Sequence, residues 1–358
     1  MSASSRRRFM PIAGVVAIAL SGVGAYMQGD VLDPARNSLP NPTKTVVTGW
    51  GPLPDGRMWG NTAGVDIGPD GNVWAYDRCG ANICEGSTVD PILKFDRSSG
   101  KILTKFGAGM FVFPHGLHVD RDGNVWVTDG QGNKEGTKGH QVIKFSPQGK
   151  VLMRLGRAGV AGNGPETFNE PNDVITAPNG DIFVSDGHSG QNPNPPPNAN
   201  GRIVKFTKDG RYIKEWGKVG SGPGEFRTPH ALAFDSKGRL FVADRGNHRI
   251  QIFDQDGKLL DEWKQFGRVS GLFIRNDMLY AIDSESDEKR HPGWKTGVRI
   301  GTTKEDKVIA FIPPHENNKP NGAAGEGVAV DADGNVYAAE GPISRPFSNG
   351  GLTKYVKK

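Results

Sequence analysis

A short pattern occurs six times along this chain: an apolar strand, a tight turn, and a second apolar strand that ends in Asp or Glu. The clear copies lie at 113–129, 170–186, 228–244 and 325–340, and weaker copies lie at 61–77 and 269–283. Self-similarity at a period of roughly 40–50 residues indicates one supersecondary unit used repeatedly, and four short strands per unit are typical of propeller blades. We therefore predict an all-β chain that folds as a six-bladed β-propeller.

Length and composition agree with a single closed ring of short strands. The chain has 358 residues, a length that on its own suggests two domains, but closed repeat folds often exceed that size. Its 35% hydrophobic content, with 51 Gly and 25 Pro, suits many strands joined by turns and excludes a disordered chain. We expect the propeller to span 43–358, with the strand-like segment 43–50 completing the last blade and so removing the free sheet edges.

The first residues have the features of an export signal. Arg6, Arg7 and Arg8 form a positive segment, 11–25 a mildly apolar one, and Val23-Gly24-Ala25 a small-residue cleavage site. The segment also resembles a twin-arginine signal, and an uncleaved membrane anchor is the alternative. We predict a signal peptide at 1–27, a polar linker at 28–42, and a periplasmic or secreted product that meets a membrane only if the leader stays attached.

The charge of the chain does not point to a nucleic-acid partner. The whole chain carries 44 basic and 39 acidic residues, and removal of Arg6, Arg7 and Arg8 leaves 41 against 39, a net charge of +2. The high isoelectric point therefore owes much to the leader, so we expect no nucleic-acid partner. We also expect a monomer.

The chain has two cysteines, Cys79 and Cys84, five positions apart in the loop DRCGANIC. In an oxidising compartment this spacing favours a local disulfide that stiffens one loop. Metal ligation by the two thiolates is the alternative, but no pair of histidines lies near them in the sequence.

At one equivalent position of the blades, alternate blades carry side chains that can bind a metal ion. Alignment of the blades on their turn glycines places six residues at the start of the inner strands: Ala63, His115, Asn172, His230, Ser270 and Glu326. Alternate blades of a six-fold ring lie about 120° apart around the axis, so His115, His230 and Glu326 should converge at the channel mouth. Two imidazoles and a carboxylate with open positions suit zinc, or iron as the alternative. For one Pro-His sequence considered alone, the simpler interpretation is a structural histidine that hydrogen-bonds to a neighbouring carbonyl group.

The acids that end the second strands recur in blade after blade, as Asp129, Asp186, Asp244 and Asp283. Such repetition indicates hydrogen bonding to loops rather than chemistry. Several loops that follow the second strands are much longer than a hairpin needs, among them 187–201 and 284–299. Long loops gathered on one rim are typical of binding surfaces.

The blade motifs FVFPHGLHVDRDGNVWVTD, FNEPNDVITAPNGDIFVSDG and LFVADRGNHRIQIF resemble NHL-repeat propellers, and in particular the peptidyl-α-hydroxyglycine α-amidating lyases. The resemblance covers roughly 55–340. It implies a zinc ion held by three histidines from alternate blades, a rim Arg and Tyr that act on a hydroxyglycine peptide, and a structural calcium ion. His115 and His230 fall on two of the zinc ligands, and Glu326 stands at the third.

The resemblance also points to two catalytic positions. Arg78 falls on the catalytic Arg of the family, and His188 stands where the family has its Tyr. His188 could act as a general acid or base near neutral pH, and Arg78 could fix a carboxylate or an oxyanion. The alternatives are a solvated loop charge for Arg78 and a histidine that caps the long loop for His188. Gly327 stands where the family has an acid after its third ligand.

These observations give a first functional hypothesis and two alternatives. The first is an exported metal-dependent propeller enzyme, a lyase or hydrolase that acts on a small organic or peptide-derived substrate. The second is a non-catalytic NHL-repeat binding module that uses the long-loop rim, since a fold alone does not establish an enzyme. A calcium-dependent lactonase-like propeller is the third, with only Glu326 and Asn172 or Asp173 as inward ligands.

Overall fold

The computed structural model describes residues 1, 37–54, 56–315, 325–340 and 350–358. The predicted signal peptide after its first residue and most of the predicted linker lie outside these residues, as do 341–349. The propeller lies within the compact unit Pro34–Lys358. No helix in the described part of the chain is long and apolar enough to cross a membrane.

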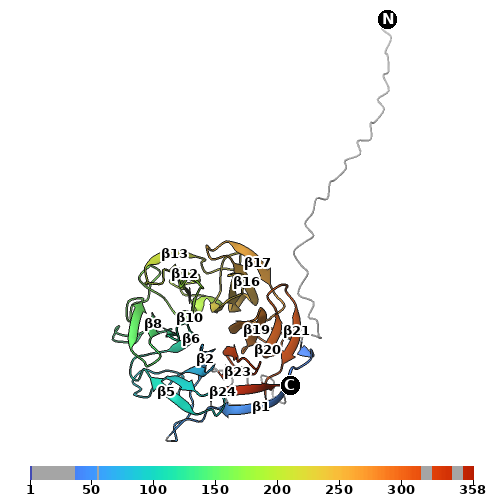
Figure 1. Cartoon of the computed structure of the whole chain (residues 1–358). Coiled ribbons are helices and arrows are strands. Elements are labelled where there is room, and N and C mark those ends of the chain that lie inside the picture. The colour runs from blue at the N-terminus through green and yellow to red at the C-terminus, as the bar shows by residue number, and fades with distance from the viewer. Residues whose placement is uncertain (2–36, 55, 316–324, 341–349) are drawn as a thin grey trace. The chain divides into compact units, whose positions relative to one another are not determined.

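Six antiparallel sheets of four strands each surround one axis, which confirms the predicted six-bladed propeller (Figure 1). The innermost strands are β2 (Thr62–Ile67), β6 (Pro114–Val119), β10 (Pro171–Thr176), β14 (Pro229–Phe234), β18 (Gly271–Arg275) and β22 (Gly327–Val330). The second strands are β3 (Val73–Asp77), β7 (Val125–Asp129), β11 (Ile182–Asp186), β15 (Leu240–Asp244), β19 (Met278–Asp283) and β23 (Val336–Glu340).

The third strands are β4 (Ile92–Phe95), β8 (Gln141–Phe145), β12 (Arg202–Phe206), β16 (Arg249–Phe253), β20 (Gly297–Thr302) and β24 (Gly351–Lys357). The outer strands are β5 (Ile102–Phe106), β9 (Val151–Leu155), β13 (Tyr212–Trp216), β17 (Leu259–Trp263), β21 (Val308–Ile312) and β1 (Thr43–Trp50). Two short 3-10 helices, η2 (Ser189–Gln191) and η3 (Arg245–Asn247), follow the second strands of blades 3 and 4.

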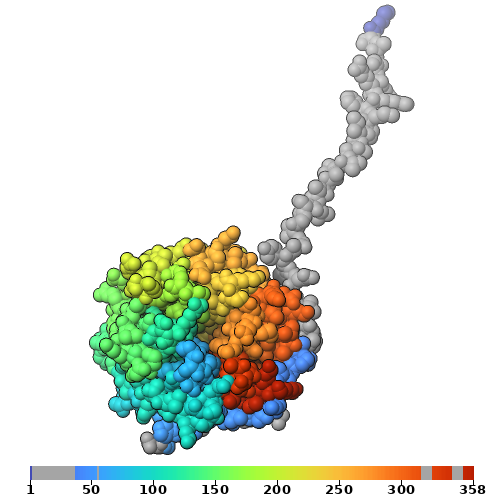
Figure 2. Space-filling model, viewed as in Figure 1, coloured from blue at the N-terminus to red at the C-terminus, as the bar shows by residue number. Residues whose placement is uncertain are grey.

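The ring closes through its N-terminal strand, as expected for 43–50. β1 pairs antiparallel with β24, so the last blade combines strands from both ends of the described region. Each innermost strand contacts its counterpart in the next blade, and β22 contacts β2. The space-filling view shows the blades packed side by side in chain order around the axis (Figure 2).

The hydrophobic core lies between the blades. The second strands β7, β11 and β15 are buried at every position, because both of their faces pack against apolar side chains. Trp126 of β7, for example, is 1% exposed and lies in a cluster with Val174 and Val184 of the next blade. This packing fixes the innermost strands, whose first residues face the channel.

The acids that end the second strands bond to loop backbone, as predicted. Asp129 accepts hydrogen bonds from the backbone N–H groups of Val112 and Phe113, just before β6. Asp244 accepts one from Arg227, just before β14. Each carboxylate therefore ties its own strand to the segment that leads into the innermost strand of the same blade, and so holds the first residues of that strand in place.

Candidate metal centre

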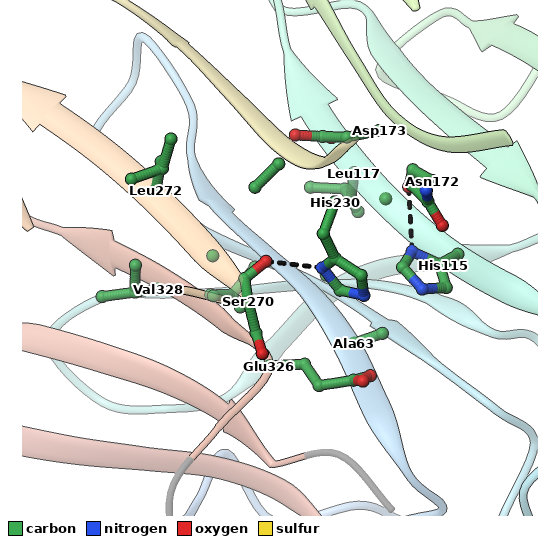
Figure 3. A pocket seen from close by; sticks show the side chains of 16 residues that line it. Ala63, His115, Leu117, Asn172, Asp173, His230, Ser270, Leu272, Glu326 and Val328 are labelled. Carbon is green, nitrogen blue, oxygen red and sulfur yellow. Dashed lines mark hydrogen bonds between the residues drawn. The ribbon is translucent and has the colours of Figure 1, made fainter. Parts of the chain in front are cut away.

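The six residues predicted at the starts of the innermost strands line one cavity at the channel mouth, of about 60 Å³ (Figure 3). Ala63, His115, Asn172 and His230 are the second residues of β2, β6, β10 and β14, and Ser270 and Glu326 immediately precede β18 and β22. The blade alignment made from the turn glycines therefore has the correct register in every blade.

His115 and His230 are held by carbonyl groups of the next blade. The Nδ1 atom of His115 lies 2.9 Å from the backbone oxygen of Asn172, and that of His230 lies 2.6 Å from the backbone oxygen of Ser270 (Figure 3). A carbonyl oxygen only accepts, so each Nδ1 carries the proton and each Nε2 presents a lone pair. Both Nε2 atoms are buried and have no hydrogen-bond partner within the described residues. Metal-binding histidines are typically oriented in this way by a second partner.

His188 is the third imidazole at this place. It follows β11 and immediately precedes η2, so the rim loop of blade 3 carries it over the channel mouth. The ring centroids of His115 and His230 are 4.7 Å apart, and the centroid of His188 lies 5.5 Å from each of them. One ring nitrogen from each of the three residues lies within 4.8 Å of the others.

The surroundings of the three imidazoles favour their neutral form. Burial, with Arg78 and Arg245 nearby, lowers the pKa of His115 to about 3. Burial, and next the charge of Arg245, lowers the pKa of His188 and of His230 well below the usual value. A metal ion needs neutral imidazole, so three converging imidazoles with unprotonated nitrogens fit a zinc ion that keeps an open position.

Glu326, expected as the third ligand, faces two arginines instead. Its Oε2 lies 3.6 Å from Nη2 of Arg78, and its Oε1 lies 3.4 Å from Nη1 of Arg245. Among the described residues, the group of mutually close ligand atoms contains the three histidines and not Glu326. The physical reason is electrostatic: a carboxylate between two buried guanidinium groups is attracted to them, whereas the imidazoles offer it no charge.

Arg78 is buried beside the site rather than solvated, with 1% of its surface exposed. Its Nε donates to the backbone oxygen of Pro114, 2.8 Å away, and its Nη1 donates to Oδ1 of Asn82, 2.9 Å away. The guanidinium also lies over the ring of Phe113, 3.9 Å from the centroid. These contacts hold one edge of the guanidinium, and Nη2 points toward Glu326.

Arg245 is a site residue that the sequence analysis missed. It is fully buried at the start of η3, and its Nη2 donates to Nε2 of His188 at 2.9 Å. Arg245 directly follows Asp244, as Arg78 directly follows Asp77. This repeated Asp-Arg pair at the end of a second strand was the signal that could have revealed it. Glu285, 3.7 Å from Nη1 of Arg245, was also missed.

The two cysteines form the expected disulfide. The sulfur atoms of Cys79 and Cys84 are bonded, with the Cα atoms 5.2 Å apart. The ring that they close contains Asn82, which receives the hydrogen bond from Arg78. The disulfide therefore stiffens the loop that positions one arginine of the site.

The family model for the NHL repeat matches residues 226–253, which include β14, β15 and β16. Over 283 residues, 75% of this chain, the sequence is 34% identical to peptidyl-glycine α-amidating monooxygenase A of Xenopus laevis. Over 168 residues, 44% of this chain, it is 36% identical to peptidyl-α-hydroxyglycine α-amidating lyase 1 of Drosophila melanogaster. The chain spans 27% of the Xenopus protein and 28% of the Drosophila protein.

A solved structure supports the fold. A gluconolactonase from Xanthomonas campestris superposes with a TM-score of 0.57 over 87% of this chain and 89% of its own, at 17% identity. At that identity the likeness concerns the fold alone. The family model and the sequence relatives confirm the resemblance that the blade motifs carry. The chain is an NHL-repeat β-propeller homologous to the peptidyl-α-hydroxyglycine α-amidating lyases and the peptidylglycine α-amidating monooxygenases.

Proposed function

We propose that this chain is a metal-dependent lyase or hydrolase, exported to an oxidising compartment, that acts on a small organic or peptide-derived substrate. The observation that carries the proposal is the pair of buried Nε2 atoms of His115 and His230, which have no partner among the described residues and face His188. Buried polar atoms in native proteins nearly always have a partner, so such a group indicates a missing ligand. A non-catalytic binding module does not require imidazole nitrogens left without partners at the channel mouth.

The metal ligands in this proposal are His115, His188 and His230, so His188 serves as a ligand instead of an acid or base. Zinc is the ion that three neutral imidazoles suit best, with iron as the alternative, and it would supply Lewis acidity. The calcium ion that the sequence resemblance implies stays a prediction. The name of the Drosophila relative supports the lyase class, and the disulfide supports the oxidising compartment.

The surrounding side chains fit a reaction in which negative charge develops on a substrate oxygen. Arg78 and Arg245 offer donors held in a water-poor site, where fixed charges act more strongly than in water. In a lyase reaction of this class, a carbinol loses its O–H proton and becomes a carbonyl. The carbon–nitrogen bond breaks, and the leaving nitrogen takes up a proton. This reaction needs no oxidant or reductant.

The space available indicates a small substrate. A second pocket of about 40 Å³ adjoins the imidazoles and is lined by Phe113, Gln131 and Glu170 together with His115, Asn172 and His188. A ligand that reaches the metal could therefore extend past the ring of Phe113 toward the rim. An acyl group or a short peptide end has suitable chemistry for this place.

The test is metal stoichiometry, followed by turnover of an N-acyl-α-hydroxyglycine and of simple lactones. We expect one zinc or iron per chain in the wild type, retained in Glu326→Gln and lost in His188→Ala and His115→Ala. His118→Ala is the matched control, because His118 lies deeper in the channel and bonds Thr176 and Asp66. A metal-free wild type, or a Glu326→Gln variant that loses metal as His188→Ala does, would overturn the proposed site.

A further inference from the structure

One residue, Glu170, holds the chain on both sides of His188. Its carboxylate accepts two hydrogen bonds from Ser189, one from the backbone N–H and one from the hydroxyl group, each at 2.7 Å. Its backbone oxygen accepts a third hydrogen bond, from the N–H of Gly187 at 3.0 Å. Gly187 and Ser189 are the direct neighbours of His188, so Glu170 fixes the point at which this imidazole leaves the backbone.

The backbone of Glu170 has a conformation that a glutamate rarely adopts. Its φ is +65°, in the left-handed region that favours glycine. Strand β10 begins at the next residue, and the N–H of Glu170 donates to Nδ1 of His140 at 3.3 Å. Strained conformations of this kind persist where the surroundings over-determine them, and they cluster at functional sites. The backbone here would suit glycine better, and what a glutamate adds is the carboxylate that reaches Ser189.

The imidazole of His188 needs such support more than the other two imidazoles do. His115 and His230 lie on innermost strands, and each Nδ1 is held by a backbone oxygen of the next blade. The ring of His188 extends from a rim loop and accepts a hydrogen bond at Nε2 from Arg245. A metal ion that takes this nitrogen removes that bond. The place of the ring then depends on its backbone.

Glu170 acts on this site through His188 and not as a ligand. It lines the small pocket beside the imidazoles. Among the described residues, however, the group of mutually close ligand atoms contains the three histidines and not Glu170. Both of its carboxylate oxygens are directed to Ser189 instead.

We infer that Glu170 is a positioning residue, whose carboxylate sets the rim loop so that His188 stays within reach of a metal ion bound by His115 and His230. The inference rests on the proposed function, because it concerns the third ligand of the same metal site. Outer partners that orient a ligand typically change metal affinity by about 10- to 100-fold. Loss of the contact with Ser189 should therefore be visible in zinc affinity, without any measurement of turnover.

The experiment is a double-mutant cycle in which zinc is titrated into metal-free protein. The four proteins are the wild type, Glu170→Gln, His188→Ala and the double variant. Glutamine keeps the size of the side chain, but its amide nitrogen cannot accept a hydrogen bond from Ser189. We expect Glu170→Gln to lower zinc affinity at least about tenfold when His188 is present. In the His188→Ala background it should change the residual affinity by less than about twofold, because no imidazole is left to position.

The cycle also separates positioning from charge. A negative charge that simply attracts the cation would have the same effect in both backgrounds. Ser189→Ala keeps that charge and removes only the hydroxyl bond, so we expect a smaller loss of affinity, again only when His188 is present. Glu166→Gln is the matched control, because Glu166 is an exposed glutamate four residues earlier in the same segment. It should keep the wild-type affinity.

Two results would overturn the inference alone: an unchanged affinity in Glu170→Gln, or an equal loss of affinity in both backgrounds. A wild type that binds no zinc, or a His188→Ala variant that binds it as tightly as the wild type, would overturn the proposed metal site and the inference with it. The failure of one is therefore distinguishable from the failure of the other.

Discussion

Arg245 donates a hydrogen bond from Nη2 to Nε2 of His188, with the two atoms 2.9 Å apart. This contact joins the rim loop of blade 3 to η3 of blade 4, and it uses a nitrogen that a metal ion could also use. The guanidinium and a metal ion therefore compete for the same lone pair whenever Nε2 is the ligand atom. The positive charge of Arg245 further opposes a cation at this place.

Removal of this competitor should tighten metal binding. For Arg245→Gln we predict a zinc affinity at least about tenfold higher than in the wild type, the scale of change found when partners of metal ligands are altered. Competition with a chromophoric chelator measures the affinity. Arg245→Lys keeps the charge without the planar fork, so an intermediate affinity would separate charge from hydrogen bonding. Unchanged or weaker binding by Arg245→Gln would contradict the competition.

The fold was predictable because its signals are periodic. Turn glycines recur at fixed distances from the apolar strands, and this spacing alone brings His115 and His230 to one cavity. The closing strand β1 was predictable for a similar reason, since the last repeat lacks one strand. Because the same pattern of apolar residues recurs in every blade, few other arrangements of the strands would bury those residues.

The third imidazole was not predictable in its role, because His188 lies in a loop whose path has no period. Blade symmetry placed Glu326 among the residues at the starts of the innermost strands, and the alternation of strand residues correctly predicts that it faces the channel. Neither pattern predicts which charged side chains reach the cavity from the rim loops. Arg78 and Arg245 reach the cavity from such positions, and they determine where the Glu326 carboxylate lies.

The disulfide should act on the site through Asn82. Oδ1 of Asn82 accepts hydrogen bonds from Nη1 of Arg78 and from Nδ2 of Asn61, and it belongs to the loop that Cys79 and Cys84 close. Replacing both cysteines by serine should lower the free energy of unfolding by about 2 kcal/mol, the chain-entropy value for a loop this short. Denaturant unfolding measures this change.

Asn82→Ala separates the two effects, because it keeps the disulfide and removes the acceptor for Arg78. We expect it to lower turnover with zinc content unchanged, and to cost less stability than the double serine variant. Normal turnover in both variants would show that Arg78 does not depend on this loop for its position.

Asp129 gives the protein a measurable dependence on pH that does not involve the metal site. Burial raises the pKa of this carboxyl to about 7, although the backbone N–H groups of Phe113 and Val112 act in the opposite direction. A carboxyl whose pKa is higher in the folded state binds its proton more tightly there than in the unfolded chain. Its contribution to stability is therefore complete below about pH 4 and is lost as the pH rises through about 7.

Asp129→Asn cannot titrate, so the difference between the two proteins isolates this one group. From about pH 5 to about pH 8, the free energy of unfolding of the wild type should fall by about 2–3 kcal/mol relative to the variant. Urea unfolding at several pH values measures the difference, and any constant cost of the amide appears as an offset that does not vary with pH. Parallel curves would show that Asp129 stays ionised throughout, with its two backbone donors outweighing the effect of burial.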